Sequence, residues 1–345
     1  MLKKFIKLFL ELFFIVLMLF CLIWHDLVIY GVSQGKGQLT LVLNAQPIEK
    51  ILKDDSFPDS LKQKLKLIVE IKQFAIDSIG IHSSNNYTTV YNQQNKSILL
   101  TVSACEPYSF KAKEWRFPFL GTVSYKGFFN RDKAEKEILE LKENDYDVDV
   151  YSPSGWSTLG WFKDPILSNM LYKSEGQLAN LIIHELTHGT IYIKDNVTFN
   201  ENLANFIGDK GAEEFLIYKY GIQSKQYTNY EQGKADDKCY TEYILKSTER
   251  LDSLYSTFLV NEKTEVKKQK KNKLIMDIVV GVNRLPLYQK KGYFRYSLKA
   301  FAKKNAFFMA FTRYDSQYEI FDKEFKEQYQ SNLYKYLIFL KEKYK

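Results

Sequence analysis

Five consecutive residues are the best suited to chemistry, His184-Glu185-Leu186-Thr187-His188. In a helix, side chains four positions apart lie on one face, so both imidazoles can reach a single metal ion. Glu185 points about a quarter of a turn away from His184, where it can accept a proton from a water molecule without ligating the metal. Two of the chain's 4 histidines lie in this motif. The pattern is the H-E-x-x-H signature, which predicts a zinc site.

The third ligand of such a site is expected to be a carboxylate. A catalytic zinc ion usually has three protein ligands and one open position. The other histidines are poorly placed, since His25 adjoins an apolar N-terminal segment and His82 lies far upstream. Glu201 is the best candidate, because the short connection after His188 lets the next helix fold back against the first. The rival acids are Asp195 in that connection and, further along the second helix, Asp209, Glu213 and Glu214.

Two imidazoles and one carboxylate around zinc predict a metallopeptidase. Zinc polarises a substrate carbonyl and lowers the pKa of a water molecule, and Glu185 would accept the water proton and pass it to the leaving amine. A tyrosine is expected to stabilise the oxyanion, because no further histidine lies nearby. One alternative is a metalloendopeptidase that acts on exported or membrane proteins. The other is a non-catalytic binding module that the metal only stabilises, with a fourth protein ligand closing the site.

The N-terminus predicts a membrane anchor. Lys3, Lys4 and Lys7 precede an apolar run from about Leu8 to Trp24, which is at the short end for a membrane-spanning helix. The positive charges predict a cytoplasmic N-terminus, and no small-x-small cleavage site follows. We therefore predict an uncleaved signal anchor over residues 1–28, single-pass in the inner membrane, with the rest of the chain in the periplasm. A cleaved signal peptide is the alternative.

The cysteines allow two further interpretations. A lipoprotein attached at Cys21 is disfavoured, because Phe20 stands where such signals have a small residue. Outside the anchor only Cys105 and Cys239 remain. An oxidising periplasm would permit a disulfide between them, and two free buried thiols are equally consistent with the sequence.

The composition limits the size of the fold and the classes of partner that the chain can bind. The 345 residues, 45% of them hydrophobic, can bury a large core. The net charge of +8 includes short lysine clusters such as 267–271, which are typical of a solvated helix face. Because there is no arginine-rich stripe and no nucleic-acid module, we expect no nucleic-acid partner.

The periodicity predicts an α+β fold that is helix-rich and has a small antiparallel sheet. Residues 29–41, with three glycines, suggest a juxtamembrane linker. Two strands at 87–91 and 97–102 are expected to form a hairpin around a turn at 92–96. The helix of the H-E-x-x-H motif is expected to begin with a capping box of Ser174 and Gln177. The remaining expected elements are helices at 58–79, 131–144, 175–192 and 200–220, a strand at 147–151, and a helical C-terminal part from about 230 in a domain of residues 29–345.

Several separate blocks together resemble one family, the bacterial zinc aminopeptidases. The matching blocks are Trp115-Arg116-Phe117-Pro118 with Gly121, Tyr125-Lys126-Gly127-Phe128-Phe129, Ser157-Thr158-Leu159-Gly160-Trp161-Phe162 with Asp164-Pro165, His184 to His188, Phe199-Asn200-Glu201 with Ala204, and Asn305-Ala306 with Tyr314. The chain departs from the family pattern at Phe128, where a tyrosine is usual, and at Lys304, where an asparagine is usual.

The resemblance implies a membrane-anchored zinc aminopeptidase with a zincin-like fold and a peptide substrate. It points to Tyr314 as the oxyanion donor, with core packing as the alternative role. In the matching loop, Ser157, Thr158 and Gly160 can offer donors to an extended peptide. Asp164 can bind the free amine of a substrate. A purely structural loop, with Asp164 serving the turn before Pro165, is the alternative.

Overall fold

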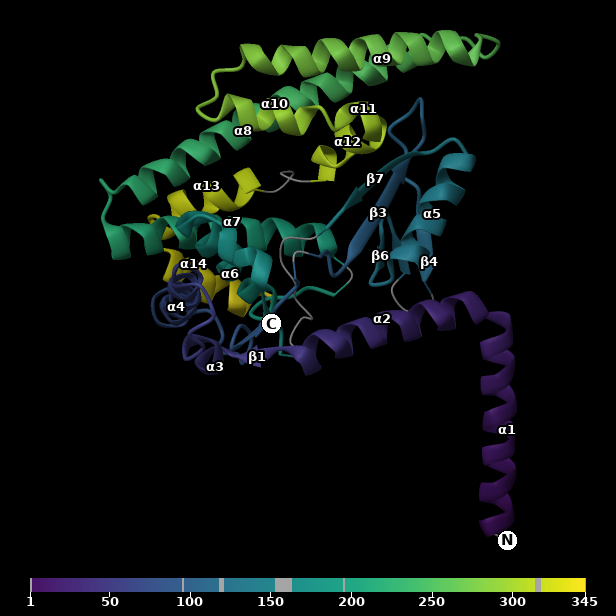
Figure 1. Cartoon of the computed structure of the whole chain (residues 1–345), viewed down its shortest axis with the longest axis horizontal. Helices are drawn as coiled ribbons and strands as arrows, with labels where there is room; N and C mark the ends of the chain where they lie inside the picture. Colours follow the sequence, from purple (N-terminus) through teal and green to yellow (C-terminus); the bar gives the residue numbers. More distant parts are fainter. Residues whose placement is uncertain are drawn as a thin grey trace.

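The three-dimensional structure, a computed structural model, describes residues 2–94, 96–117, 121–152, 163–194, 196–313 and 318–344. Within these residues helices dominate (Figure 1), and the strands form small separate sheets. The helix-rich α+β expectation agrees with this architecture.

The N-terminal helices differ in their relation to the body. Helix α1 (Leu2–Ile23) projects away from the body as an isolated rod, and its segment Lys3–Ile23 is long and apolar enough to cross a membrane (Figure 1). Helix α2 (His25–Asn44) turns sharply and runs along the edge of the body. The expectation of a linker over residues 29–41 is therefore wrong. Contacts between α2 and the body outweigh the low helix propensity of its glycines.

Two of the sheets have three strands each. One has the order β1 (Gln46–Pro47), β2 (Thr89–Tyr91), β8 (Ile166–Leu167), with β2 antiparallel to β1 and parallel to β8. The other is antiparallel, with the order β6 (Lys126–Phe128), β3 (Leu100–Cys105), β7 (Asp147–Tyr151), and α5 (Arg131–Glu143) packs against it. Strands β4 (Trp115–Phe117) and β5 (Gly121–Val123) pair with each other.

The hairpin expected around residues 92–96 does not form. Strands β2 and β3 are present near the expected positions, but they belong to different sheets. Both strands are short, and so short a pattern does not specify which partner each strand pairs with. The sheet that contains β2 is also mixed rather than purely antiparallel, because β8 runs parallel to it.

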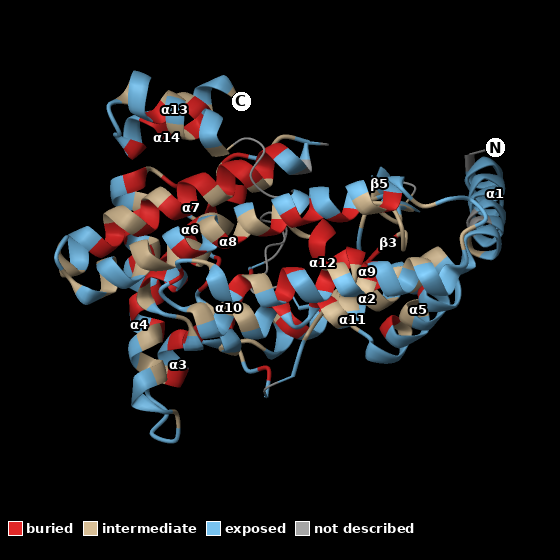
Figure 2. Ribbon diagram, turned by 90° about the horizontal axis from the view of Figure 1, so that it is seen from above, coloured by how far each residue is buried: buried red, intermediate tan, exposed pale blue. Residues whose placement is uncertain are grey.

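The main hydrophobic core lies among six helices. Buried apolar residues such as Ile68, Ile183, Phe206 and Leu337 meet there. The helices are α3 (Ile48–Leu52), α4 (Asp59–Phe74) with its π-helical extension Ala75–Ile79, α6 (Glu175–His188), α7 (Val197–Tyr220), α13 (Tyr318–Tyr329) and α14 (Leu333–Lys343). The predicted capping box of Ser174 and Gln177 is present at the start of α6. Figure 2 shows the buried residues gathered along α6 and α7, while α1 is exposed along its length.

A second core is built from the helices that follow residue 225. It contains Tyr240, Leu251, Ile278 and Phe308. The helices are α8 (Lys225–Ser256), α9 (Thr264–Gly281), α10 (Lys290–Ser297), α11 (Ala300–Lys303) and α12 (Asn305–Met309). The expected helical C-terminal part agrees with this arrangement.

A buried polar cluster joins this second core to strand β7. The Lys271 ammonium forms an ion pair with Asp147, and the backbone NH of Asn305 donates to the same carboxylate at 3.0 Å. The Asn305 side chain also accepts a hydrogen bond from Tyr255 at 2.6 Å. Cys105 and Cys239 are both free thiols, and Cys105 is buried in β3.

Candidate metal centre

His184, His188 and Glu201 lie together on two packed helices. One ligand atom from each residue lies within 4.8 Å of the other two. The Glu201 carboxylate reaches both rings, with one oxygen 3.6 Å from Nε2 of His184 and the other 3.5 Å from Nε2 of His188. The two imidazoles lie edge to face with their centroids 4.9 Å apart. Among the described residues, this is the one group of His, Cys, Asp and Glu side chains with metal-ligand spacing.

The connection between α6 and α7 places Glu201 opposite the histidines. Asn196 caps α7 by accepting a hydrogen bond from the NH of Phe199 at 3.2 Å. Asn200 stabilises the connection with two hydrogen bonds. Its side chain accepts from the NH of Ile193 at 2.8 Å and donates to the carbonyl of Ile193 at 2.7 Å. These contacts fix the first turn of α7, so that the next residue, Glu201, faces α6.

A glycine allows the two helices to approach closely at the site. A Cβ added to Gly208 would lie 3.0 Å from Cβ of His184 and 2.9 Å from the carbonyl oxygen of Asn180. Ordinary van der Waals contact begins at about 3.5 Å. Only glycine therefore fits this helix crossing, which carries the ligands of both helices.

Burial controls the charge of the ligands. It lowers the pKa of His184 to about 3, with a further contribution from His188, and lowers the pKa of His188 to about 4. Burial also raises the pKa of Glu201, and it raises the pKa of Glu185 to about 8, assisted by the charges of Glu201 and Asp164. Near neutral pH both imidazoles are neutral, which is the form that binds a metal.

These residues fit a divalent cation. Carboxylates are held close to one another and face neutral imidazoles, so a positive charge at the centre would offset their repulsion. The side chain of Asn205, one helical turn after Glu201, is hydrogen-bonded to the imidazole of His184. Such an outer contact orients a ligand in metal sites. In the described part of the chain, Nδ1 of His188 is buried without a hydrogen-bond partner.

Asp164 lies near this centre and is fully buried. The Asn86 side chain donates to the Asp164 carboxylate at 3.2 Å and accepts from its backbone NH at 3.2 Å. The next residue, Tyr87, donates its backbone NH to the carbonyl of Asp164 at 2.8 Å. Tyr87 is buried with a φ of 59°, which is unusual for a tyrosine. Its pKa is raised well above the usual value by burial and by the charges of Glu185 and Asp164.

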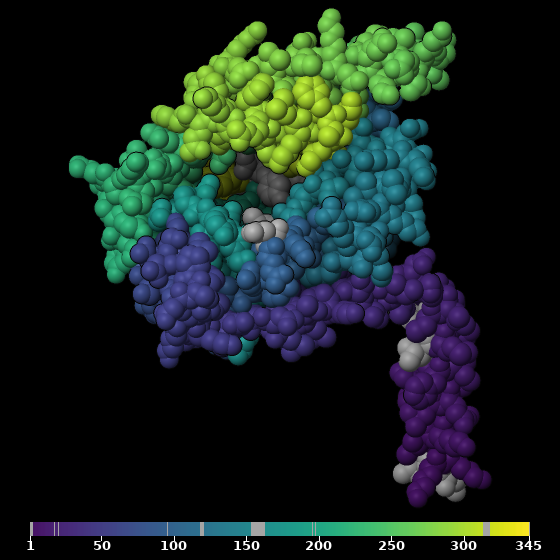
Figure 3. Space-filling model, in the orientation of Figure 1, coloured from purple at the N-terminus to yellow at the C-terminus, as the bar shows by residue number. Residues whose placement is uncertain are grey.

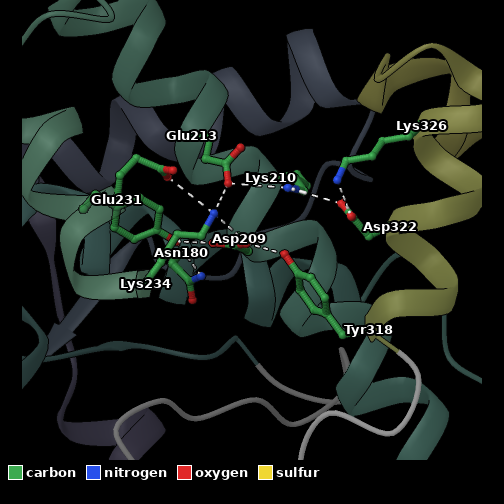
Figure 4. Close-up of polar contacts among 10 residues, drawn as sticks. Asn180, Asp209, Lys210, Glu213, Glu231, Lys234, Tyr318, Asp322 and Lys326 are labelled. Atoms are coloured by element: carbon green, nitrogen blue, oxygen red, sulfur yellow. Dashed lines mark hydrogen bonds and ion pairs between the residues drawn. The ribbon is translucent and has the colours of Figure 1, made fainter. Parts of the chain in front are cut away.

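Asp209 and Glu213, two of the rival acids on α7, are engaged elsewhere. Asp209 accepts hydrogen bonds from Tyr230, at 2.9 Å, and from Tyr318 (Figure 4). Lys234 pairs with Asp209 at 3.1 Å and also with Glu213. This network joins α6, α7, α8 and α13 beside the candidate centre, because the Tyr230 hydroxyl also accepts from Asn180 at 2.9 Å. Its role is to hold the helices together.

Other expected site residues lie outside the described residues. These are Ser157, Thr158, Gly160 and Tyr314, together with the rival ligand Asp195. His25 is exposed at the start of α2, and the backbone NH of His82 donates to Thr190 beyond the end of α6. Sequence reasoning missed Asn86, Tyr87, Asn205 and Gly208. The only local signal among these is Asn205, which shares a helix face with Glu201 at a spacing of four.

Comparison with known proteins identifies the family of this chain. The family model described as "Putative aminopeptidase" matches residues 29–342. The chain belongs to this aminopeptidase family. The match covers the body from α2 to α14 and includes both helices of the candidate metal centre. No curated protein and no solved structure matches the chain. Membership in the aminopeptidase family supports a peptidase that acts on peptides.

Proposed function

We propose that the chain is a zinc-dependent metallopeptidase, and specifically an aminopeptidase, with a zincin-like fold. The single observation that carries the proposal is the placement of ligand atoms from His184, His188 and Glu201 within 4.8 Å of one another. Glu185 follows the first ligand directly on α6, and burial and the charge of Glu201 raise its pKa. The aminopeptidase family supports the reaction class.

His184, His188 and Glu201 are the residues that would hold the ion. Two imidazoles and one carboxylate form a ligand set that suits catalytic zinc and leaves one position open. When bound, zinc supplies Lewis-acid polarisation of a peptide carbonyl and lowers the pKa of a water molecule. Asn205 orients His184 through its hydrogen bond, and Gly208 keeps α7 in contact with α6 at the same residue.

Glu185 is the proposed general base. Its burial beside Glu201 and Asp164 raises the affinity of its carboxylate for a proton. It would take a proton from the attacking water molecule and deliver it to the leaving amine. Tyr314 is proposed to donate a hydrogen bond to the oxyanion. Ser157, Thr158 and Gly160 are proposed to bind the peptide backbone.

The charge of the site favours a substrate with a free N-terminus. Glu185, Glu201 and Asp164 are close enough to interact electrostatically. The carboxylate of Asp164 lies close enough to Glu185 to act on its charge, and a negative charge at this position attracts a protonated α-amine. Because Asp164 is fully buried, we propose that it acts on the amine through its charge, while Asn86 holds its position.

The test uses the full chain purified in detergent. We expect bound zinc and hydrolysis of amino-acid arylamides, and we expect Glu185→Gln to keep its zinc but lose about a hundredfold or more in kcat, the contribution of a general base. Glu249→Gln is the matched control, because Glu249 is exposed on α8. A Glu185→Gln variant as active as the control would refute the proposed mechanism.

A second measurement separates the aminopeptidase from an endopeptidase. Acetylation of the N-terminus of a peptide substrate removes the charge that an aminopeptidase recognises. We expect the acetylated peptide to be resistant and the free peptide to be trimmed one residue at a time. Internal cleavage of both peptides at equal rates would assign the site to an endopeptidase.

The location of the site follows from α1. We propose that residues 1–28 anchor the chain in the inner membrane with a cytoplasmic N-terminus, and that residues 29–345 carry the peptidase in the periplasm. The segment Lys3–Ile23 has the length and composition of a membrane span, and its lysines lie at the end expected to stay in the cytoplasm.

A further inference from the structure

We propose that α2 is an interfacial helix, which lies on the surface of the lipid bilayer and inserts its outer face into it. The outer face consists of Ile29, Val32, Leu39 and Leu43. The proposal rests on α1 as a membrane anchor and is independent of the peptidase reaction.

The opposite face of α2 is attached to the body. The Tyr30 hydroxyl donates to the carbonyl of Gly127 at 2.8 Å, and the Gln34 amide donates to the same carbonyl. Gly37 packs against the ring of Phe129, and Leu41 is buried. These contacts recur at spacings of three and four, so they occupy one side of the helix along most of its length.

The outer face is apolar and uncovered. Val32 is 67% exposed and Leu43 is 78% exposed, and Ile29 and Leu39 are exposed as well. These residues also recur at spacings of three, four and seven, so they form a second stripe on the side of α2 that faces away from the body. Lys36 is the exposed charge within the stripe, and a lysine side chain can extend its ammonium to the lipid headgroups. Such a stripe on one side of a helix is typical of helices that lie in the membrane interface.

The junction with α1 directs this stripe toward the bilayer. Helix α1 ends at Ile23 and α2 begins at His25, and the chain turns sharply between the two helices (Figure 1). If α1 crosses the membrane, α2 must therefore run along the surface. The body lies on one side of α2, and α1 projects on the other (Figure 3). The stripe that faces away from the body thus faces the lipid. Trp24, which is 46% exposed at the junction, is a residue type enriched at membrane interfaces.

The consequence is a fixed orientation of the body on the membrane. A helix of 20 residues is about 30 Å long. Attachment along that length, in addition to α1, would prevent the body from rotating freely about a single tether. The candidate metal centre would then stay at a constant height above the lipid, with access for substrates from the periplasm.

The test measures contact of single positions with lipid. The full chain is reconstituted in vesicles of phosphatidylethanolamine and phosphatidylglycerol with the photocrosslinking residue p-benzoylphenylalanine at Val32 or, in a second variant, at Leu43. Leu12 in α1 is the membrane control. Val260, at the tip between α8 and α9 and fully exposed, is the matched aqueous control. We expect lipid adducts, measured by mass spectrometry, at Val32 and Leu43 at least about tenfold above Val260 and close to the level at Leu12.

Each other outcome overturns the proposal. If Leu12 is crosslinked to lipid but Val32 and Leu43 match Val260, α1 is anchored and α2 does not touch the bilayer. If Val32 and Leu43 are crosslinked to another copy of the chain, the outer face is a dimer interface. If Leu12 also fails to react with lipid, α1 is not in the membrane and the inference falls with the anchor. None of these outcomes affects the peptidase proposal.

Discussion

Substitution of Gly208 by alanine tests whether the close contact between α6 and α7 sets the geometry of the metal ligands. The added Cβ would lie 2.9 Å from the carbonyl oxygen of Asn180 and 3.0 Å from Cβ of His184. Relief of these contacts requires α7 to move by roughly 0.5–1 Å, since ordinary contact lies near 3.5–4 Å. The movement would carry Glu201 away from the two histidines.

Two opposing effects decide how much the Gly208→Ala substitution changes the free energy of unfolding. Alanine is favoured over glycine inside a helix by about 1 kcal/mol, whereas overpacking costs about 1–3 kcal/mol. We therefore expect Gly208→Ala to lower the free energy of unfolding by about 0–2 kcal/mol. The functional loss should be larger, on the order of a hundredfold in kcat/KM, because a misplacement near 1 Å can cost that much.

Gly233→Ala provides the matched control. Gly233 lies inside α8, and a Cβ added there meets nothing within 4 Å. This variant should gain about 1 kcal/mol of stability from helix propensity alone and keep its zinc and its activity. The measurements are denaturant unfolding, zinc affinity by competition with a chelator, and arylamide hydrolysis.

Comparison of the two variants shows whether the contact at Gly208 positions the metal ligands. If Gly208→Ala binds zinc and hydrolyses substrate as well as Gly233→Ala does, the helix contact does not position the ligands. If the two variants also have the same stability, the contact distances around Gly208 carry no energetic cost.

Three further predictions concern other sites. Asn205→Ala should weaken zinc binding by about 10–100-fold without unfolding the chain, because it removes the hydrogen bond to His184; unchanged zinc affinity would contradict this. Lys304 has a φ of 49°, so Lys304→Gly should raise the free energy of unfolding by about 1 kcal/mol, while Lys304→Ala should not; equal stability of the two variants would argue against strain there. Burial and the charge of Glu213 raise the pKa of Glu214 to about 7, so ionisation of Glu214 costs stability as the pH rises from about 4.5 through 7. Glu214→Gln should therefore stabilise the chain by about 1–2 kcal/mol at pH 8, after allowance for partial solvent exposure, and by almost nothing near pH 4; a gain that does not depend on pH would exclude this cause.

Local sequence patterns were sufficient for much of the helical architecture. The helix from Asp59 to Ile79, the helix α5, the strand β7 and the capping box at Ser174 all agree with the sequence predictions. Local sequence was also sufficient to identify His184, Glu185 and His188 as candidate site residues, because a spacing of four places the two histidines on one helix face.

Contacts between distant segments decided the features of the fold that the local sequence did not predict. Strands β2 and β3 separate into different sheets because each finds partners far along the chain, β8 in one case and β6 and β7 in the other. Residues 29–41 are helical because one face of α2 packs against the body, which a glycine-rich sequence does not indicate. The free thiols of Cys105 and Cys239 also depend on where the fold places them.

The sequence by itself determined that the imidazoles of His184 and His188 share one helix face and that Glu185 points about a quarter of a turn away, because these relations follow from the pitch of a single helix. Only the tertiary structure decided that Glu201 meets them, that Asn205 and Gly208 hold the crossing, and that Asp164 is buried beside Glu185. The physical reason is that these relations depend on how helices and loops pack against one another, and packing depends on residues that are distant in the chain.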